Sequence, residues 1–206
     1  MKRFVTIEGC EGVGKSTQIR MLKEYLERTG QPAVFTREPG GTPVSEKIRE
    51  ILLDENGEIS PVVEAYLFAA ARAAHVERVI RPALERGELV ICDRFIDSSI
   101  AYQGQARELG FDTVLEINAH AVGDTMPDCT VFIDMSPENS WRKQKGNVVE
   151  HDRMEAESAE FHKKVYEGFL KLAKENSRFV CIQPEVDKNA THQKIVEALR
   201  ERGMIR

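Results

Sequence analysis

The stretch GCEGVGKST (residues 9–17) matches the phosphate-binding loop pattern, in which two glycines five residues apart precede a lysine and a hydroxyl side chain. Apolar FVTI (4–7) comes shortly before it and amphipathic QIRMLKEYLERTG (18–30) follows, so the loop joins a predicted strand to a predicted helix. Glycines let the backbone curl around an anion, and a helix N-terminus favours negative charge. The whole loop is therefore predicted to hold a nucleoside triphosphate, through Gly9, Cys10, Glu11, Gly12, Val13, Gly14, Lys15, Ser16 and Thr17.

Three side chains of this loop have distinct expected orientations. Lys15 is placed to bridge the β- and γ-phosphates, and the Ser16 hydroxyl is placed to ligate Mg²⁺. Glu11 is expected to point away from the triphosphate, because an unpaired carboxylate facing it would cost several kcal/mol. The loop does not decide what is done with the nucleotide, since GTPases, ATP-driven machines and small-molecule kinases share it.

Short apolar runs alternate with helical patterns along the whole chain. Continuous apolar strands of this kind are typical of a parallel sheet that is covered on both faces. We therefore predict an α/β fold of three layers, α/β/α, as in P-loop NTPases, in a single domain that spans residues 1–206. The five predicted strands are 4–7, 33–36, 89–92, 129–133 and 179–182.

The predicted helices rest on apolar spacing and on local start signals. Ser60-Pro61 is a strong helix start, and the helix that follows is expected to run to about Arg86 with a kink at Pro82. Asp112 is expected to cap the helix over 113–122. The other helices are expected after the phosphate loop, over 44–53, from Ser136-Pro137, over 155–173 and over 190–202.

Composition narrows the classes of function. The chain has 206 residues and a formal net charge of -5, so it lacks the basic footprint of a general nucleic-acid or membrane binder. No apolar stretch approaches the length of a membrane span, and the N-terminus has no signal-peptide pattern. The four cysteines form no CxxC pair and are interpreted as buried free thiols of a cytoplasmic protein.

The segment VICDRFIDSSIAYQG (90–104) has a second set of functional candidates. Asp93 follows a buried strand, where a second Mg²⁺-organising carboxylate would lie, and Arg94 comes next. Ligands of open α/β sheets bind at the carboxyl ends of the strands. A local ion pair at the strand end is the alternative interpretation of these two residues.

Two further motifs indicate a second ligand. LFAAARAAH (67–75) places Phe68 and Arg72 on one helical face, which suits a planar heterocycle with a carbonyl, although a core Phe beside a surface Arg has the same spacing. TREPGGT (36–42) contributes Arg37, and Arg49 follows one helix later. These arginines could be solvated surface residues, or they could converge with Arg94 on the phosphate of an acceptor.

Taken together, these motifs resemble one family, bacterial thymidylate kinase, which transfers the γ-phosphoryl group of ATP to dTMP. The resemblance covers nearly the whole chain, and the combination of REPGGT with DRFIDSSIAYQG is its most specific part. It implies in-line phosphoryl transfer that yields dTDP, with Mg²⁺ and ATP as cofactor and donor, in a cytoplasmic homodimer that binds no nucleic acid.

The resemblance also implies roles for individual residues. Phe68 would stack on thymine, Arg72 would donate to its carbonyl, and Tyr102 would crowd the 2′ position of the sugar. Glu11 would accept a hydrogen bond from the 3′-hydroxyl group. The other dTMP-binding residues would be Arg37, Arg49 and Arg94 at the phosphate, Ser99 and Gln103 at the base, and Ser98. Ser16 and Asp93 would organise the metal.

Catalysis would depend on positive charge rather than on a base. The phosphate loop has no basic residue before Lys15, so the resemblance implies that a lid over about 142–153 supplies arginines. The implied catalytic residues are Lys15, Arg94, Arg142 and Arg153. His75 and His151 are interpreted as structural or surface residues.

The sequence departs from many relatives at two places and leaves other functions open. Ala71 replaces an acidic residue, and the lid is poor in arginine. The alternatives are a kinase of another nucleotide or deoxynucleoside, and a P-loop switch protein that binds nucleotide without an acceptor.

Overall fold

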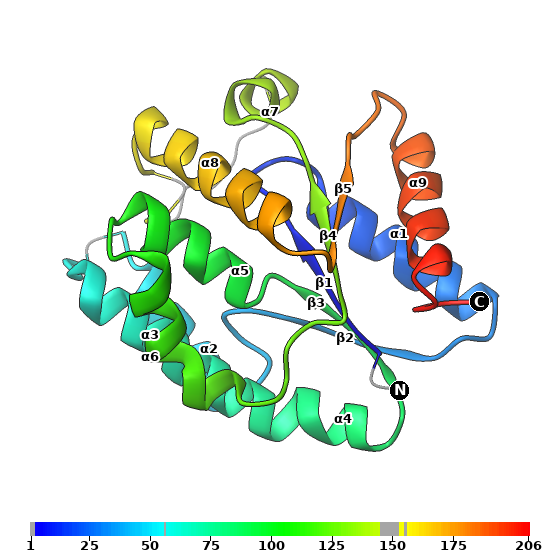
Figure 1. The fold of residues 1–206 in the computed structure, drawn as a ribbon, viewed down its shortest axis with the longest axis horizontal. Helices are drawn as coiled ribbons and strands as arrows, with labels where there is room; N and C mark the ends of the chain where they lie inside the picture. Colours follow the sequence, from blue (N-terminus) through cyan, green and yellow to red (C-terminus); the bar gives the residue numbers. More distant parts are fainter. Residues whose placement is uncertain (1–2, 56, 145–152, 155) are drawn as a thin grey trace.

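The computed structural model describes residues 3–55, 57–144, 153–154 and 156–206, and the side chains of 142–144 lie outside the description. A single sheet of five parallel strands runs through the molecule in the order β2-β3-β1-β4-β5. The α/β fold with a five-stranded parallel sheet is therefore confirmed (Figure 1). The strands are β1 (Arg3–Glu8), β2 (Ala33–Arg37), β3 (Leu89–Asp93), β4 (Cys129–Ile133) and β5 (Phe179–Ile182).

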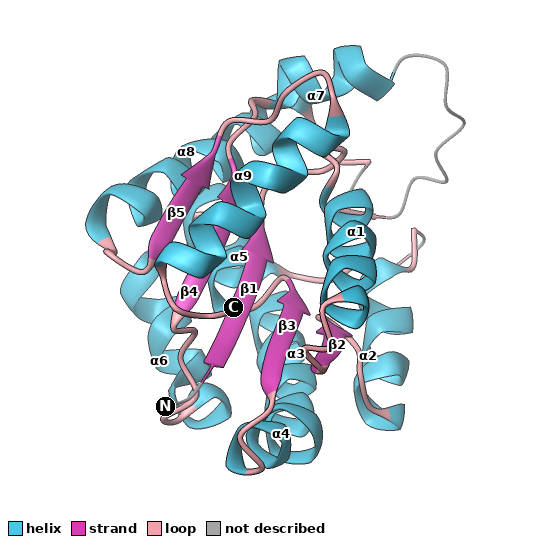
Figure 2. Ribbon diagram, turned by 90° about the vertical axis from the view of Figure 1, so that its right-hand side faces the viewer, coloured by secondary structure: helices cyan, strands magenta, loops and turns pink. Residues whose placement is uncertain are grey.

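The helices cover both faces of the sheet. Figures 1 and 2 show α1 and α9 together on one face, and α5 and α8 on the other. This burial explains the apolar strands, since every residue of β4 is buried. The helices are α1 (Lys15–Arg28), α2 (Pro43–Leu53), α3 (Pro61–His75), α4 (Arg81–Glu85), α5 (Ile96–Ser99), α6 (Phe111–Val122), α7 (Pro137–Gln144), α8 (Ala159–Glu175) and α9 (Lys188–Glu201), with π-helical segments η1 (Val76–Ile80) and η2 (Ile100–Ala106).

The register aligns the ends of three neighbouring strands. Asp93 of β3 pairs with Ile7 of β1 on one side and with Arg37 of β2 on the other. The carboxyl ends of these parallel strands therefore meet at one edge, where the phosphate loop also begins. This edge is where an α/β sheet binds its ligands.

Several predicted boundaries are confirmed and others are wrong. Ser60 caps α3 as expected, since its hydroxyl oxygen accepts from the Val63 amide at 3.4 Å. Asp112 does not cap α6, because that helix begins at Phe111 after Gly110, whose φ of 86° suits glycine. The predicted helix over 155–173 starts instead at Ala159, where the Ser158 side chain caps it.

The long helix predicted to run from Pro61 to about Arg86 is interrupted near Pro82. A π-helical turn, η1, separates α3 from α4 just before that proline. Proline lacks an amide hydrogen and clashes with the preceding turn, so the helical hydrogen-bond pattern is disturbed there.

The segment 96–106, which carries no helix in the sequence interpretation, is helical as α5 and η2. Close packing against α8 fixes it, because a Cβ atom at Gly168 would lie 3.0 Å from the Cα atom of Ala101. This segment brings Ser98, Ser99, Tyr102 and Gln103 to the carboxyl edge of the sheet. One cysteine departs from expectation, since Cys181 is exposed whereas Cys10, Cys92 and Cys129 are buried.

Candidate active site

The phosphate loop lies between β1 and α1 and folds around Lys15. The Lys15 ammonium group donates to the carbonyl oxygens of Gly9 at 3.0 Å and Cys10 at 2.8 Å. Gly9 has φ of 148°, and a Cβ atom there would lie 2.9 Å from the Ile133 carbonyl oxygen, so this position requires glycine. Burial, and then the nearby charge of Arg94, lowers the pKa of Lys15.

A cavity of about 850 Å³ opens beside this loop. Seven of the nine predicted loop residues, from Glu11 to Thr17, line it. Gly9 and Cys10 are not among the described lining residues. Their carbonyl groups hold the Lys15 ammonium group instead. Burial raises the pKa of the Cys10 thiol to about 12, so this thiol is inert.

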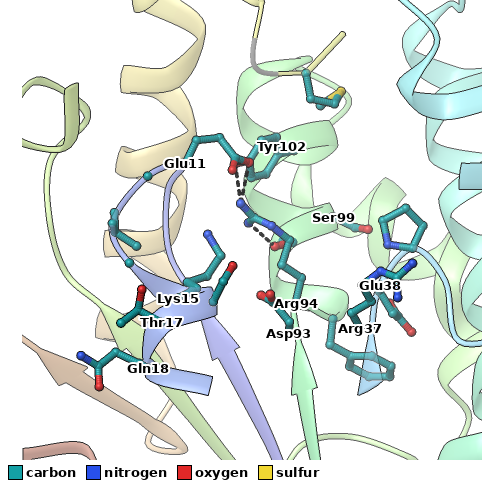
Figure 3. A pocket seen from close by; sticks show the side chains of 18 of the residues that line it. Glu11, Lys15, Thr17, Gln18, Arg37, Glu38, Asp93, Arg94, Ser99 and Tyr102 are labelled. Atoms are coloured by element: carbon teal, nitrogen blue, oxygen red, sulfur yellow. Dashed lines mark hydrogen bonds and ion pairs between the residues drawn. The ribbon is translucent and has the colours of Figure 1, made fainter. Parts of the chain in front are cut away.

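Arg94 reaches from the end of β3 toward Glu11 and Tyr102, as Figure 3 shows. Its guanidinium group donates to Glu11 at 2.5 Å, to the Tyr102 hydroxyl at 3.2 Å and to Ser98 Oγ at 2.9 Å. The Tyr102 hydroxyl in turn donates to Glu11 at 2.9 Å. Glu11 thus points out of the loop, toward Arg94. Arg94 has φ of 66°, which is uncommon for a residue with a side chain.

The charge of Glu11 is fixed by these neighbours. Burial opposes its ionisation, but the positive charges of Arg94 and Lys15 outweigh burial and lower the pKa of Glu11 to about 2. Glu11 is therefore a carboxylate at neutral pH. It can accept a hydrogen bond from a ligand hydroxyl group at this point of the cavity.

A second carboxyl group, Glu8, lies behind Arg94. It is fully buried and accepts hydrogen bonds from the Phe95 amide at 2.8 Å and the Ser98 hydroxyl at 2.6 Å. Because Ser98 also accepts from Arg94, Glu8 supports the position of the arginine through Ser98. Burial, followed by the charge of Asp97, raises the pKa of Glu8 to about 8.

Arg72 is 1% exposed and lines the cavity, and its partners Glu38 and Ser99 lie on the far side of Arg94 from Lys15 in Figure 3. It donates to Glu38 at 2.8 Å and to Ser99 at 3.1 Å, and also contacts Asn118. Phe68 lines the same cavity. The alternative of a surface arginine at position 72 is therefore wrong, and the fixed guanidinium group can face a planar ligand.

The arginines predicted to converge on a phosphate line this one cavity. Arg37 forms an ion pair with Glu46 at 2.8 Å, and Arg49 donates to the Pro39 carbonyl oxygen at 3.0 Å. Together with Arg94, both have their side chains at the cavity. Ser98, Ser99, Tyr102 and Gln103 line it as well.

The predicted metal-binding pair also lies at the cavity. Asp93 Oδ1 is buried and accepts no hydrogen bond from the described residues, so this oxygen is available to a cation or to its water ligands. Ser16 is exposed and lines the same cavity. No cluster of three acidic, histidine or cysteine side chains forms a metal site within the described part of the chain. Two oxygen donors suit Mg²⁺, which usually takes its remaining ligands from phosphates and water.

The predicted lid lies mostly outside the described residues. The backbone of Arg142 lies in the last turn of α7, but its side chain is not described, and residues 145–152, which include His151, are not described either. Arg153 does not line the cavity with Lys15. It forms an ion pair with Glu64 at 2.7 Å and donates to the Leu52 carbonyl oxygen at 2.9 Å.

His75 is fully buried and structural in its contacts. It forms hydrogen bonds to Glu38 at 2.9 Å and to Thr36 at 2.6 Å. These contacts join the end of β2, the following loop and α3, so His75 stabilises the β2 end, which carries Arg37, and the loop residue Glu38.

The sequence interpretation missed a third contribution to the cavity. The loop between β5 and α9 lines it close to Gln18, and Lys188 of α9 accepts a hydrogen bond from Gln18 through its carbonyl group. The sequence could have indicated this region, because the carboxyl end of a predicted fifth parallel strand must lie at the same edge of the sheet as the ends of the other strands. The missed residues of this region are Gln18, Pro184, Val186, Asp187, Lys188 and Thr191.

In the described part of the chain, no helix is both long and apolar enough to cross a membrane.

Known proteins resemble this chain over nearly its whole length. The family model described as thymidylate kinase matches residues 7–195. A thymidylate kinase of Caldanaerobacter subterraneus subsp. tengcongensis is 46% identical over 200 residues, covering 97% of this chain and 95% of the relative. One of Symbiobacterium thermophilum is 47% identical over 201 residues, covering 97% and 92%. The crystal structure of thymidylate kinase from Ehrlichia chaffeensis has a TM-score of 0.78 at 34% identity, covering 97% of this chain and 98% of that chain. The chain belongs to the thymidylate kinase family.

Proposed function

We propose that this protein catalyses the ATP-dependent phosphorylation of dTMP to dTDP at the carboxyl edge of its sheet. One observation carries the proposal. A single cavity is lined by the phosphate loop at one end and by Phe68 and Arg72 at the other, with Lys15 and Arg94 along it. Such a cavity can hold two nucleotides with their phosphates facing each other. Membership of the thymidylate kinase family identifies the enzyme class.

We assign the ATP end of the cavity to the phosphate loop. Backbone amides of residues 9–17 hold the phosphates, and the Lys15 ammonium group reaches the β- and γ-phosphates. Ser16 and Asp93 would hold Mg²⁺, which when bound neutralises charge on the phosphate oxygens. The uncommitted oxygen of Asp93 supports this assignment. The nucleoside of the donor would lie against the loop between β5 and α9, which lines the same cavity.

We assign the dTMP end to the arginines and to α3, α5 and η2. Arg37, Arg49 and Arg94 hold the acceptor phosphate, and Glu11 accepts from the 3′-hydroxyl group. Tyr102, whose hydroxyl group is held by Glu11 and Arg94, closes the 2′ side of the sugar. The base contacts come from Phe68, Arg72, Ser99 and Gln103, and Ser98 supports Arg94 at the phosphate.

Transfer then needs alignment and charge stabilisation, and no strong base. The acceptor is a phosphate oxygen that is already nucleophilic, so holding it in line with the γ-phosphate supplies much of the rate. Lys15 and Arg94 are the described cations placed to stabilise charge in the transition state. We keep Arg142 and Arg153 of the 142–153 lid as candidate contributors. Arg153 would first have to leave Glu64.

The test is a stoichiometric turnover assay. With ATP and excess dTMP, we expect one dTDP for each ADP, and turnover with dUMP, dCMP and thymidine should be lower. ADP formation that does not depend on dTMP would favour a P-loop switch protein instead, and faster turnover of another acceptor would identify a different nucleotide kinase.

The family resemblance also leads us to propose a cytoplasmic homodimer. Light scattering coupled to size exclusion should give twice the mass of one chain, and cell fractionation should recover the protein with the cytoplasmic fraction. A monomer mass, or recovery with membranes, would contradict the respective part of this proposal.

A further inference from the structure

We infer that Glu64 is a positioning residue for base specificity, because it fixes the amide of Gln103 with its carbonyl oxygen toward the acceptor base. The inference rests on the proposed function, since it concerns the base end of the same cavity. It gives a role to a fully buried carboxylate that neither the phosphate loop nor the acceptor arginines explain.

Glu64 lies in the first turn of α3 and is 0% exposed. Its Oε2 atom accepts from Arg153 at 2.7 Å and from Arg107 at 3.2 Å. Two guanidinium groups thus hold this buried side chain as a carboxylate, which can only accept hydrogen bonds. Its other oxygen, Oε1, accepts from Gln103 Nε2 at 2.8 Å and more weakly from Arg107 Nε at 3.3 Å.

This contact determines how the Gln103 side chain is turned. A glutamine amide has one donor end and one acceptor end, and a carboxylate partner can bind the donor end alone. The acceptor end, Gln103 Oε1, must then face away from Glu64. Gln103 lines the cavity, and none of the residues described donates a hydrogen bond to that oxygen. The oxygen is therefore left for a ligand donor.

A fixed donor, Arg72, lines the same cavity as this acceptor. Arg72 donates to Ser99 at 3.1 Å, and Ser99 precedes Gln103 by about one turn of the same helical segment. The pair Arg72 and Gln103 consequently presents a donor next to an acceptor. Thymine and uracil present the complement, a carbonyl oxygen next to a ring N–H. Cytosine presents an amino group and a bare ring nitrogen, so both contacts would be mismatched.

The test is Glu64→Gln, in which the neutral amide can either donate to or accept from Gln103. Gln103 is then free to turn over and offer its amide nitrogen to cytosine. We expect the ratio of kcat/KM for dTMP over dCMP to fall by roughly tenfold or more. The ratio for dTMP over dUMP should stay within about twofold, because those two bases share the same hydrogen-bonding edge.

Arg107→Gln is the matched control. It breaks an ion pair of Glu64 but leaves the Glu64–Gln103 hydrogen bond, so both ratios should stay within about twofold. If Glu64→Gln does not fold, as judged by circular dichroism, Gln103→Met gives the second measurement. It removes both ends of the amide while Glu64 keeps its arginines, and it should lose the same dTMP-over-dCMP preference.

The outcomes distinguish the role of Glu64 from the proposed function itself. An unchanged dTMP-over-dCMP ratio, or a parallel fall of both ratios, would overturn the role of Glu64 in an enzyme that still phosphorylates dTMP. Failure of the wild-type protein to phosphorylate dTMP would instead overturn the proposed function.

Discussion

Replacement of Arg94 by alanine should abolish most of the turnover while the chain stays folded. Arg94 lines the cavity beside the phosphate loop, its side chain is 16% exposed, and its guanidinium group is oriented by Glu11, Ser98 and Tyr102. An oriented arginine at a transferring phosphoryl group contributes about 10³- to 10⁵-fold in rate. That range corresponds to roughly 4 to 7 kcal/mol of transition-state stabilisation.

The same substitution has a smaller effect on stability. Arg94 is the main group that lowers the pKa of Glu11 from 4.5 to about 2, and Lys15 adds to this effect. Removing one partner of a buried ion pair typically costs about 3 to 5 kcal/mol, because the other charge is left unpaired. A domain of ordinary stability survives such a loss. Circular dichroism and thermal unfolding of Arg94→Ala will verify this point.

The assay is steady-state formation of dTDP at saturating ATP and dTMP. We expect kcat to fall by at least 10³-fold in Arg94→Ala, and Arg94→Lys to recover part of the loss, since it restores charge without the planar fork. Arg20→Ala is the matched control, because Arg20 is an exposed α1 residue paired with Glu24, and its turnover should change less than about twofold. A kcat within tenfold of wild type in a folded Arg94→Ala protein would refute the role of Arg94.

Three further predictions concern Glu8, Gly9 and Asp93 at the carboxyl edge of the sheet. Because burial, and next Asp97, raises the pKa of Glu8 from 4.5 to about 8, the folded protein keeps a proton that the unfolded chain releases. The free energy of unfolding should therefore fall as the pH rises from about 4.5 to about 8, by up to ~1.4 kcal/mol per pH unit. Glu8→Gln should flatten this part of the urea-unfolding profile, and an unchanged slope would contradict the shift. Gly9→Ala should lower the free energy of unfolding by about 1 to 3 kcal/mol, because the added methyl group would meet the Ile133 carbonyl oxygen. The same substitution should weaken ATP binding in calorimetric titration. ATP affinity equal to that of the wild type would argue against this packing. Asp93→Asn should raise the Mg²⁺ concentration needed for half-maximal turnover roughly tenfold or more, and an unchanged Mg²⁺ dependence would remove Asp93 from the metal site.

The sequence was sufficient for those parts of the fold that depend on local pattern. The five strands are short continuous apolar runs, which are typical of a sheet covered on both faces, and the phosphate loop has its glycines at fixed spacing. Once the parallel sheet is predicted, the carboxyl-edge rule brings Arg37, Asp93 and Arg94 together without further information. All three line the same cavity in the structure.

Features that depend on tertiary packing could not be predicted in this way. The helix over 96–106 contains serine, glycine and β-branched residues of modest helix propensity, and it is held by its contact with α8. The burial of Glu8 and Glu64 likewise has no sequence signal, because acidic residues are usually exposed. Arg153 could be identified as a cation near the lid, but its ion pair with Glu64 follows from three-dimensional contacts alone.

The central claim is that donor and acceptor occupy one cavity with their phosphates between Lys15 and Arg94. The most direct measurement is calorimetric titration with adenosine and thymidine joined 5′ to 5′ through a chain of phosphates. We predict that one molecule binds per chain, more tightly than either nucleotide alone, and that it prevents binding of both ATP and dTMP. Displacement of only one of the two nucleotides, or independent binding of two molecules of the ligand per chain, would contradict the shared cavity.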